Sequence, residues 1–187
     1  MSRLRTRLDV EKLTRLHSEA RRLLELPEAT IQSKVPSISA WSALVHLHHV
    51  ALVNEIALAK IEEILAEGNP GSTGSRGGLH PLGWLCIRIL GFIPRGRGRA
   101  PEVVIPPPGS TREAALCAIQ ARIAQTTRLA PLSREIRAAC GRRKHFVFGY
   151  LRASDWLRFA IIHTHHHLRI VQEILHASKT YSKQRKP

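Results

Sequence analysis

The stretch SDWLRFAIIHTHHHLRIVQEILHA, residues 154–177, has the apolar spacing of a helix that packs on one side. Ser154 is a suitable N-cap, and Asp155 lies where the helix dipole favours a negative charge. Apolar residues recur three and four positions apart and give one continuous face: Trp156, Phe159, Ala160, Ile170, Val171 and Ile174. The pattern predicts a long amphipathic helix whose apolar face covers the core.

Five of the 11 histidines of the chain lie between residues 163 and 176 of this helix. Continuing the apolar face through the middle of the helix places His163 and His167 on its buried side. Helical geometry turns His165 and His166 about 100 to 200° away from His163, so they are expected to face a neighbouring element or solvent. Only His163 and His167 therefore need a special explanation.

The other helices follow from the same kind of spacing, and no strand is required. Helices are predicted over residues 9–26, with Asp9 as N-cap, over residues 39–67, and from Ser110 or Thr111 to about residue 129. A short apolar helix is expected over residues 81–93, followed by an extended proline-rich segment. We therefore predict an all-α four-helix bundle with a long crossover connection and one extra short helix. One domain is expected over residues 1–178, with a basic flexible tail over residues 179–187.

The composition favours a protein without a membrane segment. The N-terminal residues lack the apolar run and the cleavage site of a secretory signal. The longest apolar run, around residues 82–93, contains Arg88 and is too short to cross a bilayer. Three cysteines without a C-x-x-C spacing suit a reducing compartment, and each is expected to be a small buried apolar residue. We expect a soluble cytoplasmic protein.

The chain of 187 residues carries a formal net charge of +15, which attracts anions of several classes. Nucleic acid, acidic lipid surfaces and anionic small molecules are candidates, and a solvated arginine-rich surface is the simpler interpretation. The basic clusters lie in separate loops, at residues 95–99 and 141–144, and in the tail. That distribution does not favour a nucleic-acid interface, but a basic nucleic-acid-binding module stays an alternative.

Two histidines one helical turn apart on a buried face can bind a single metal ion, because their side chains lean the same way. A third ligand must come from elsewhere, and the helix over residues 39–67 offers His46, His48 and His49. His49 shares a face with Val45 and Val53, His46 lies on the adjoining face, and His48 lies farther round. A core histidine hydrogen-bonded to a carboxylate or a carbonyl is the alternative interpretation.

Three motifs resemble the DinB/YfiT-like superfamily of four-helix metalloenzymes. Trp41-Ser42 followed by His49 is similar to the start of that family's second helix and its first ligand. HFVFGYLRASDW, at residues 145–156, looks like the approach to the last helix in a branch described only as a domain of unknown function. His163-x3-His167 is similar to the closing helix of that branch. Together with HPLGWL and APEVVIPPPGS in the middle region, the likeness spans most of residues 10–176.

The resemblance implies that His49, His163 and His167 bind one divalent ion, zinc or nickel, with water in the open positions. His46 and His166 are candidates to support the ligands or to act as acid or base. The resemblance also implies a metal-dependent thiol-linked transferase or isomerase, or a hydrolase, with a low-molecular-weight thiol as cosubstrate. No catalytic residue can be assigned.

The substrate side is less well defined by the sequence. We expect a small-molecule substrate of anionic type, attracted by basic residues such as Arg158 or Arg169. Ile170 stands where many relatives have glutamine after the last histidine. The non-catalytic alternative is a structural bundle, kept for stability or for pairing as a homodimer, whose histidines only fill the interior.

Overall fold

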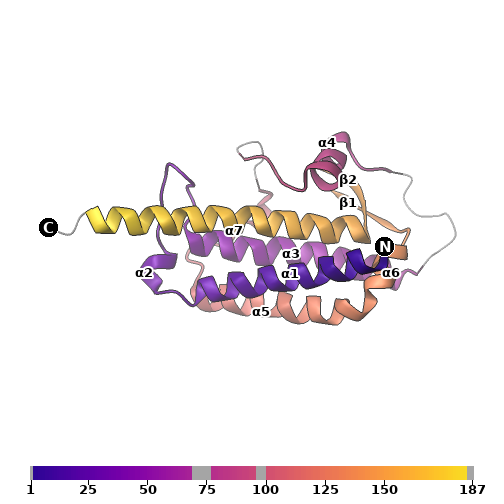
Figure 1. Ribbon diagram of the computed structural model, residues 1–187, viewed down its shortest axis with the longest axis horizontal. Coiled ribbons are helices and arrows are strands. Elements are labelled where there is room, and N and C mark those ends of the chain that lie inside the picture. Colours follow the sequence, from indigo (N-terminus) through magenta and orange to yellow (C-terminus); the bar gives the residue numbers. More distant parts are fainter. Residues whose placement is uncertain (1, 69–76, 96–99, 185–187) are drawn as a thin grey trace.

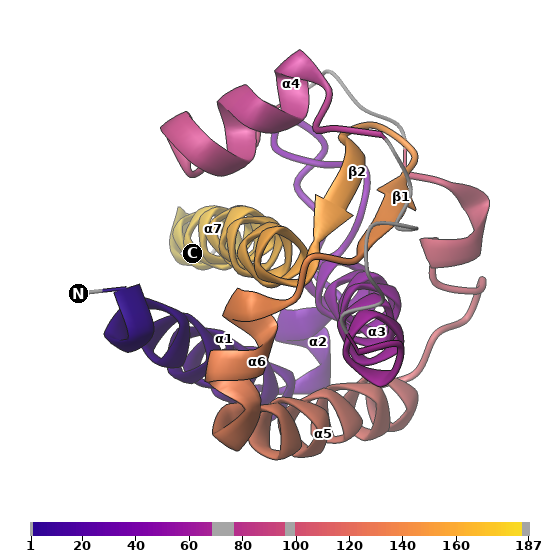
Figure 2. The same ribbon diagram turned by 90° about the vertical axis from the view of Figure 1, so that its right-hand side faces the viewer.

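Four long helices form the body of the computed structural model, which describes residues 2–68, 77–95 and 100–184 (Figure 1). They are α1 (Ser2–Leu24), α3 (Ala43–Ala66), α5 (Arg112–Leu129) and α7 (Ala153–Gln184). An end-on view shows α7, α3, α5 and α1 arranged around a common interior (Figure 2). The most extensive contact of α3 is with α7, and that of α1 is with α5. The prediction of a mostly helical fold is confirmed for the described residues.

Capping side chains set the starts of α3 and α7. Ser42 caps α3, because its Oγ accepts a hydrogen bond from the Val45 N–H at 3.3 Å. The helix therefore begins at Ala43, a few residues later than expected. α7 begins at Ala153, so Ser154 lies inside the helix and is not its N-cap. Asp155 Oδ2 accepts from the Arg152 N–H at 3.4 Å. α7 also continues to Gln184, beyond the predicted end near residue 177.

The starts of α1 and α5 also bear on the predicted caps. α1 begins at Ser2, so Asp9 lies inside the helix and is not its N-cap. Of the two candidate caps of α5, Thr111 fills the role, because its side chain accepts from the Ala114 N–H at 3.2 Å. The Ser110 hydroxyl instead donates to the Pro107 carbonyl at 2.8 Å.

Short helical elements occupy the connections. α2 (Glu28–Ile31) lies between α1 and α3. α4 (Pro81–Gly83) and the π-helical η1 (Trp84–Leu90) form the expected short apolar helix, which ends at Gly91 with φ +67°. The crossover to α5 contains the single turn η2 (Glu102–Val104), and η3 (Ala130–Leu132) and α6 (Ser133–Ala138) follow α5.

A two-stranded hairpin overturns the expectation that the fold needs no strand. β1 (Arg142–His145) pairs antiparallel with β2 (Gly149–Arg152) directly before α7. The turn is closed by the His145 imidazole, whose Nδ1 accepts from the Val147 N–H at 3.1 Å and from the Phe148 N–H at 3.2 Å. A side chain that binds its own turn in this way stabilises a hairpin too short for a clear alternating pattern.

The hairpin holds α4 and η1 beside the start of α7 (Figure 2). The His80 N–H donates to the Phe148 carbonyl at 2.9 Å. Gly83 lies so close to Phe148 that an added Cβ would stand 2.7 Å from this carbonyl oxygen. Arg88 of η1 forms an ion pair with Asp155 at 2.6 Å, which ties η1 to the first turn of α7.

The expectation that all three cysteines are buried is wrong for two of them. Cys86 is buried as predicted, whereas Cys117 and Cys140 are exposed. On α5, Ala115 and Ile119 are buried, and Cys117 lies midway between them in the sequence. Helical geometry turns a residue at that position away from the core, which accounts for its exposure.

Among the described residues, α3 is the one helix with the length and hydropathy of a membrane-spanning segment. However, 67% of its apolar stretch is buried inside the protein. Leu44, Leu47 and Leu58 of α3 are fully buried. Burial of this kind is typical of a core helix.

Candidate metal centre

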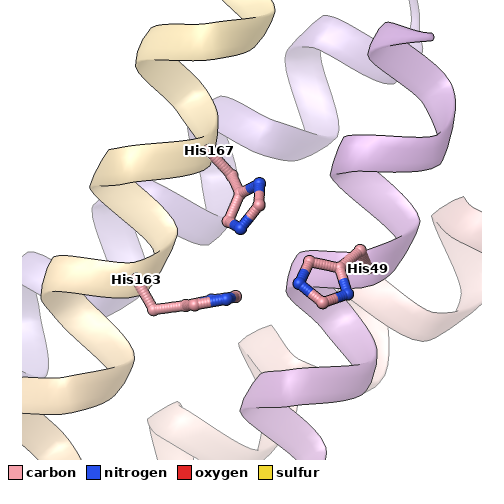
Figure 3. A group of neighbouring side chains, drawn as sticks. All are labelled: His49, His163 and His167. Atoms are coloured by element: carbon pink, nitrogen blue, oxygen red, sulfur yellow. The ribbon is translucent and has the colours of Figure 1, made fainter. Parts of the chain in front are cut away.

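The packing of α3 against α7 brings His49, His163 and His167 together (Figure 3). Each offers one ring nitrogen such that the three atoms lie within 4.8 Å of one another. Their ring centroids are separated by 5.1 Å for His49 and His163, 4.7 Å for His49 and His167, and 4.5 Å for His163 and His167. The exposed fractions of the three residues are 3, 8 and 9% respectively. The cluster is therefore a buried set of three imidazoles supplied by two helices.

The orientation of His49 is fixed by the crossover segment. His49 Nδ1 lies 2.7 Å from the carbonyl oxygen of Val104 in η2. A carbonyl only accepts, so Nδ1 must carry the hydrogen and donate. In the neutral imidazole, Nε2 then has a free lone pair. In histidine ligands of metals, the ring nitrogen that does not bind the ion typically donates a hydrogen bond in this way and so fixes the ring.

His167 is held by His46, one of the two predicted supporting histidines. The Nδ1 atoms of His46 and His167 are 2.9 Å apart, so one of them donates to the other. On its far side, His46 Nε2 lies 2.9 Å from the Ser39 Oγ. The backbone N–H of Trp41 also donates to the Ser39 Oγ, at 3.1 Å. A hydrogen-bond chain thus runs from the half-buried Ser39 in the loop before α3 to the buried His167 on α7.

His163 has no comparable partner. Its Nδ1 is buried and makes no hydrogen bond within the described part of the chain. Its ring lies against Phe159, with centroids 5.5 Å apart. A buried polar atom without a partner is costly, and coordination of an ion through this nitrogen would relieve that cost. The donor set therefore fits a divalent cation.

Burial keeps these imidazoles neutral near pH 7. It holds the pKa of His163 and of His167 well below 6.5, and the neighbouring histidines lower both pKa values further. The pKa of His49 is also lowered, chiefly by burial, although the Val104 hydrogen bond opposes the shift. Burial, followed by His49, lowers the pKa of His46 to about 4. Neutral imidazole is the form that binds metal ions.

The remaining histidines of interest lie outside the cluster. His166 is half-buried, and its ring centroid is 5.1 Å from that of His167. His165 is exposed, as predicted. His48 is buried, but neither it nor His145, which binds the hairpin turn, belongs to the group of candidate ligands.

Sequence reasoning missed two partners of the cluster, the Val104 carbonyl and the Ser39 hydroxyl. A backbone carbonyl has no residue-specific pattern, because every residue carries one. Ser39 was included in a predicted helix, whereas it lies in the loop before α3, where it can reach His46. Trp41 lies in the same loop, with its ring centroid 5.0 Å from that of His49.

These features define a helical protein with a buried three-histidine cluster between two closely packed helices. A family model, that of the DinB superfamily, matches residues 12–171. The chain belongs to this superfamily, whose members typically bind divalent metals. Neither a curated protein nor a solved structure gave a significant match.

Proposed function

We propose that the chain binds one divalent metal ion through His49, His163 and His167. The observation that carries the proposal is the convergence of three buried ring nitrogens within 4.8 Å of one another. Nδ1 of His49 is hydrogen-bonded to the Val104 carbonyl, and Nδ1 of His167 is hydrogen-bonded to Nδ1 of His46. The Nε2 atoms of these two residues are thus the donors left for the ion. Zinc or nickel suits a set of imidazole ligands.

Three neutral ligands favour a catalytic over a purely structural role. A divalent ion held by three imidazoles keeps its full charge and an open position, and it can lower the pKa of a bound water or thiol. His46 and Ser39 would fix the ring of His167. Their hydrogen bonds would also give a proton on Nδ1 of His167 a path toward Ser39. We propose a metal-dependent thiol-linked transferase or isomerase, or a hydrolase, on the strength of this arrangement and the resemblance to the superfamily.

The fold of the whole chain also fits the superfamily. We propose that α1, α3, α5 and α7 form a four-helix bundle of the DinB/YfiT-like type, with the crossover between α4–η1 and α5 as its long connection. Residues 1–178 would form one domain of a cytoplasmic protein. Of the basic segment 179–187, residues 179–184 continue α7. The crossover has a function in this bundle, because it contains the Val104 carbonyl that holds His49.

Elemental analysis of the purified protein tests the metal proposal. We expect about one equivalent of zinc or nickel per chain after incubation with the ion and removal of the excess. Replacing both His163 and His167 by alanine should abolish retention, and His49→Ala should weaken it strongly. His165→Ala is the matched control, because this histidine lies on the exposed side of the same helix. Wild-type protein that is folded and still takes up neither ion would refute the proposal.

A further inference from the structure

A groove lies along the side of α7 next to the histidine cluster. Its volume is about 220 Å³. One wall is the chain segment after η1, with Phe92, Pro94 and Arg95, and the other is α7, with His165, His166 and Arg169. Each wall carries both apolar and cationic side chains, around a space large enough for a small molecule.

Two permanent positive charges, Arg95 and Arg169, line the groove, and they differ in their ion pairs. Arg95 makes a two-point ion pair with Glu173 of α7, with N–O distances of 2.7 and 2.8 Å. This pair fixes the segment after η1 over α7. Glu173, one turn along α7, adds a negative charge near Arg169, but its carboxylate is paired with Arg95. Arg169 itself is exposed and makes no ion pair among the described residues. Its guanidinium is therefore available to an anion from solvent.

The groove and the candidate metal centre share a border at His166. His166 lines the groove, and its ring centroid is 5.1 Å from that of His167. The groove therefore borders the candidate metal centre through this side chain.

We propose that this groove binds the carboxylate or phosphate group of a small molecule whose other end reaches the metal centre. A guanidinium binds either group through paired N–H donors, which favours Arg169 as the main contact. Phe92 and Pro94 would cover the apolar part of the same molecule. The role in substrate binding rests on the proposed function, whereas anion binding in the groove does not.

Titration calorimetry of the full chain at low ionic strength tests anion binding, with succinate and inorganic phosphate as separate probes. We expect Arg169→Ala to weaken binding of at least one probe about tenfold or more, which is the usual effect of losing one charge-assisted contact. Arg22→Ala is the matched control: it removes an equal charge from the exposed surface of α1 and should leave the dissociation constant unchanged. Comparing the two probes distinguishes a carboxylate site from a phosphate site.

Glu173→Gln gives a second test with the opposite sign. Glutamine removes the negative charge that acts on both Arg95 and Arg169, while its amide oxygen can still accept a hydrogen bond from Arg95 and keep the segment after η1 in place. The same anion should therefore bind several-fold more tightly. Equal affinities for wild-type protein, Arg169→Ala and Glu173→Gln, or no binding of either probe, would overturn the proposal. Repeating the anion titration on chelator-treated wild-type protein, beside the metal-uptake measurement, separates the metal-centre hypothesis from the groove hypothesis. Anion binding without metal uptake rejects only the metal centre, and metal uptake without anion binding rejects only the groove.

Discussion

At the residue level, His46 shows how a side chain beside the cluster can control it. It is 3% exposed and joins the ring of His167 to the Ser39 hydroxyl. If His167 binds an ion through Nε2, its Nδ1 carries the hydrogen and donates to His46. His46 must then donate from Nε2 to Ser39, so one assignment of hydrogens satisfies the whole chain. The ring of His167 is thereby oriented before any ion arrives.

His46→Phe should therefore weaken metal binding although it removes no ligand. Phenylalanine fills similar space and leaves Nδ1 of His167 without its partner. Loss of such a supporting hydrogen bond typically costs about 10- to 100-fold in metal affinity. Competition with a chromophoric chelator measures the effect.

The matched control for this change is His48→Phe. It makes the same substitution at a buried position two residues along α3, outside the group of candidate ligands. His48→Phe should leave the metal affinity unchanged. Equal affinities for wild-type protein and His46→Phe would show that His46 does not support the site.

At the level of elements, α3, α5 and α7 could be predicted because their evidence is local. Apolar spacing defines them, and Thr111, one of the two predicted caps of α5, starts that helix. The same periodicity predicted that His163 and His167 face the core. It could not predict the hairpin, whose turn depends on hydrogen bonds from its own backbone to His145. Nor could it place the Val104 carbonyl, because the packing of the crossover against α3 is a long-range contact.

The hairpin requires a glycine at position 149. Its φ is +79°, and an added Cβ would lie 2.7 Å from both the Gly78 carbonyl oxygen and the His80 nitrogen. Gly149→Ala therefore combines an unfavourable backbone conformation with a backbone clash. We expect it to lower the free energy of unfolding by about 3 kcal/mol. Urea denaturation measures the change.

Gly109 provides the matched control for this substitution. Its φ of +78° is almost the same, but nothing lies within 4 Å of an added Cβ. Gly109→Ala should cost only about 1 kcal/mol, from the backbone conformation alone. Equal losses for the two variants would mean that the contact between the hairpin and residues 78–80 contributes nothing.

At the level of the whole molecule, a buried polar cluster connects three of the long helices. Asn54 Nδ2 of α3 lies 2.7 Å from both His17 Nε2 of α1 and Thr164 Oγ1 of α7. His17 is fully buried, and burial, followed by the charge of Arg122, lowers its pKa to about 3. Thr164 is next to His163, so this cluster also helps to set the position of α7 against α3.

The pKa of His17 predicts how the stability of the whole fold depends on pH. Unfolded chains protonate this histidine near pH 6.5, whereas the folded protein does so only near pH 3. Between these values the unfolded state binds more protons, so stability falls as the pH falls. One such histidine contributes a slope of about 1.4 kcal/mol per pH unit in the middle of this window. His46 and His145, each with a pKa of about 4, add to the loss in the same direction.

His17→Gln should remove the contribution of this one residue. Glutamine keeps a neutral polar group near Asn54 but does not titrate, so the slope of unfolding free energy against pH should decrease by about 1.4 kcal/mol per unit. Urea denaturation at several values between pH 4.5 and 6, with a chelator present, measures the slope without a metal contribution. His165→Gln, at an exposed position of α7, should retain the wild-type slope. A His17→Gln slope equal to that of wild-type protein would mean that His17 does not remain neutral in the folded state, and that the acid sensitivity of the fold arises at other buried histidines.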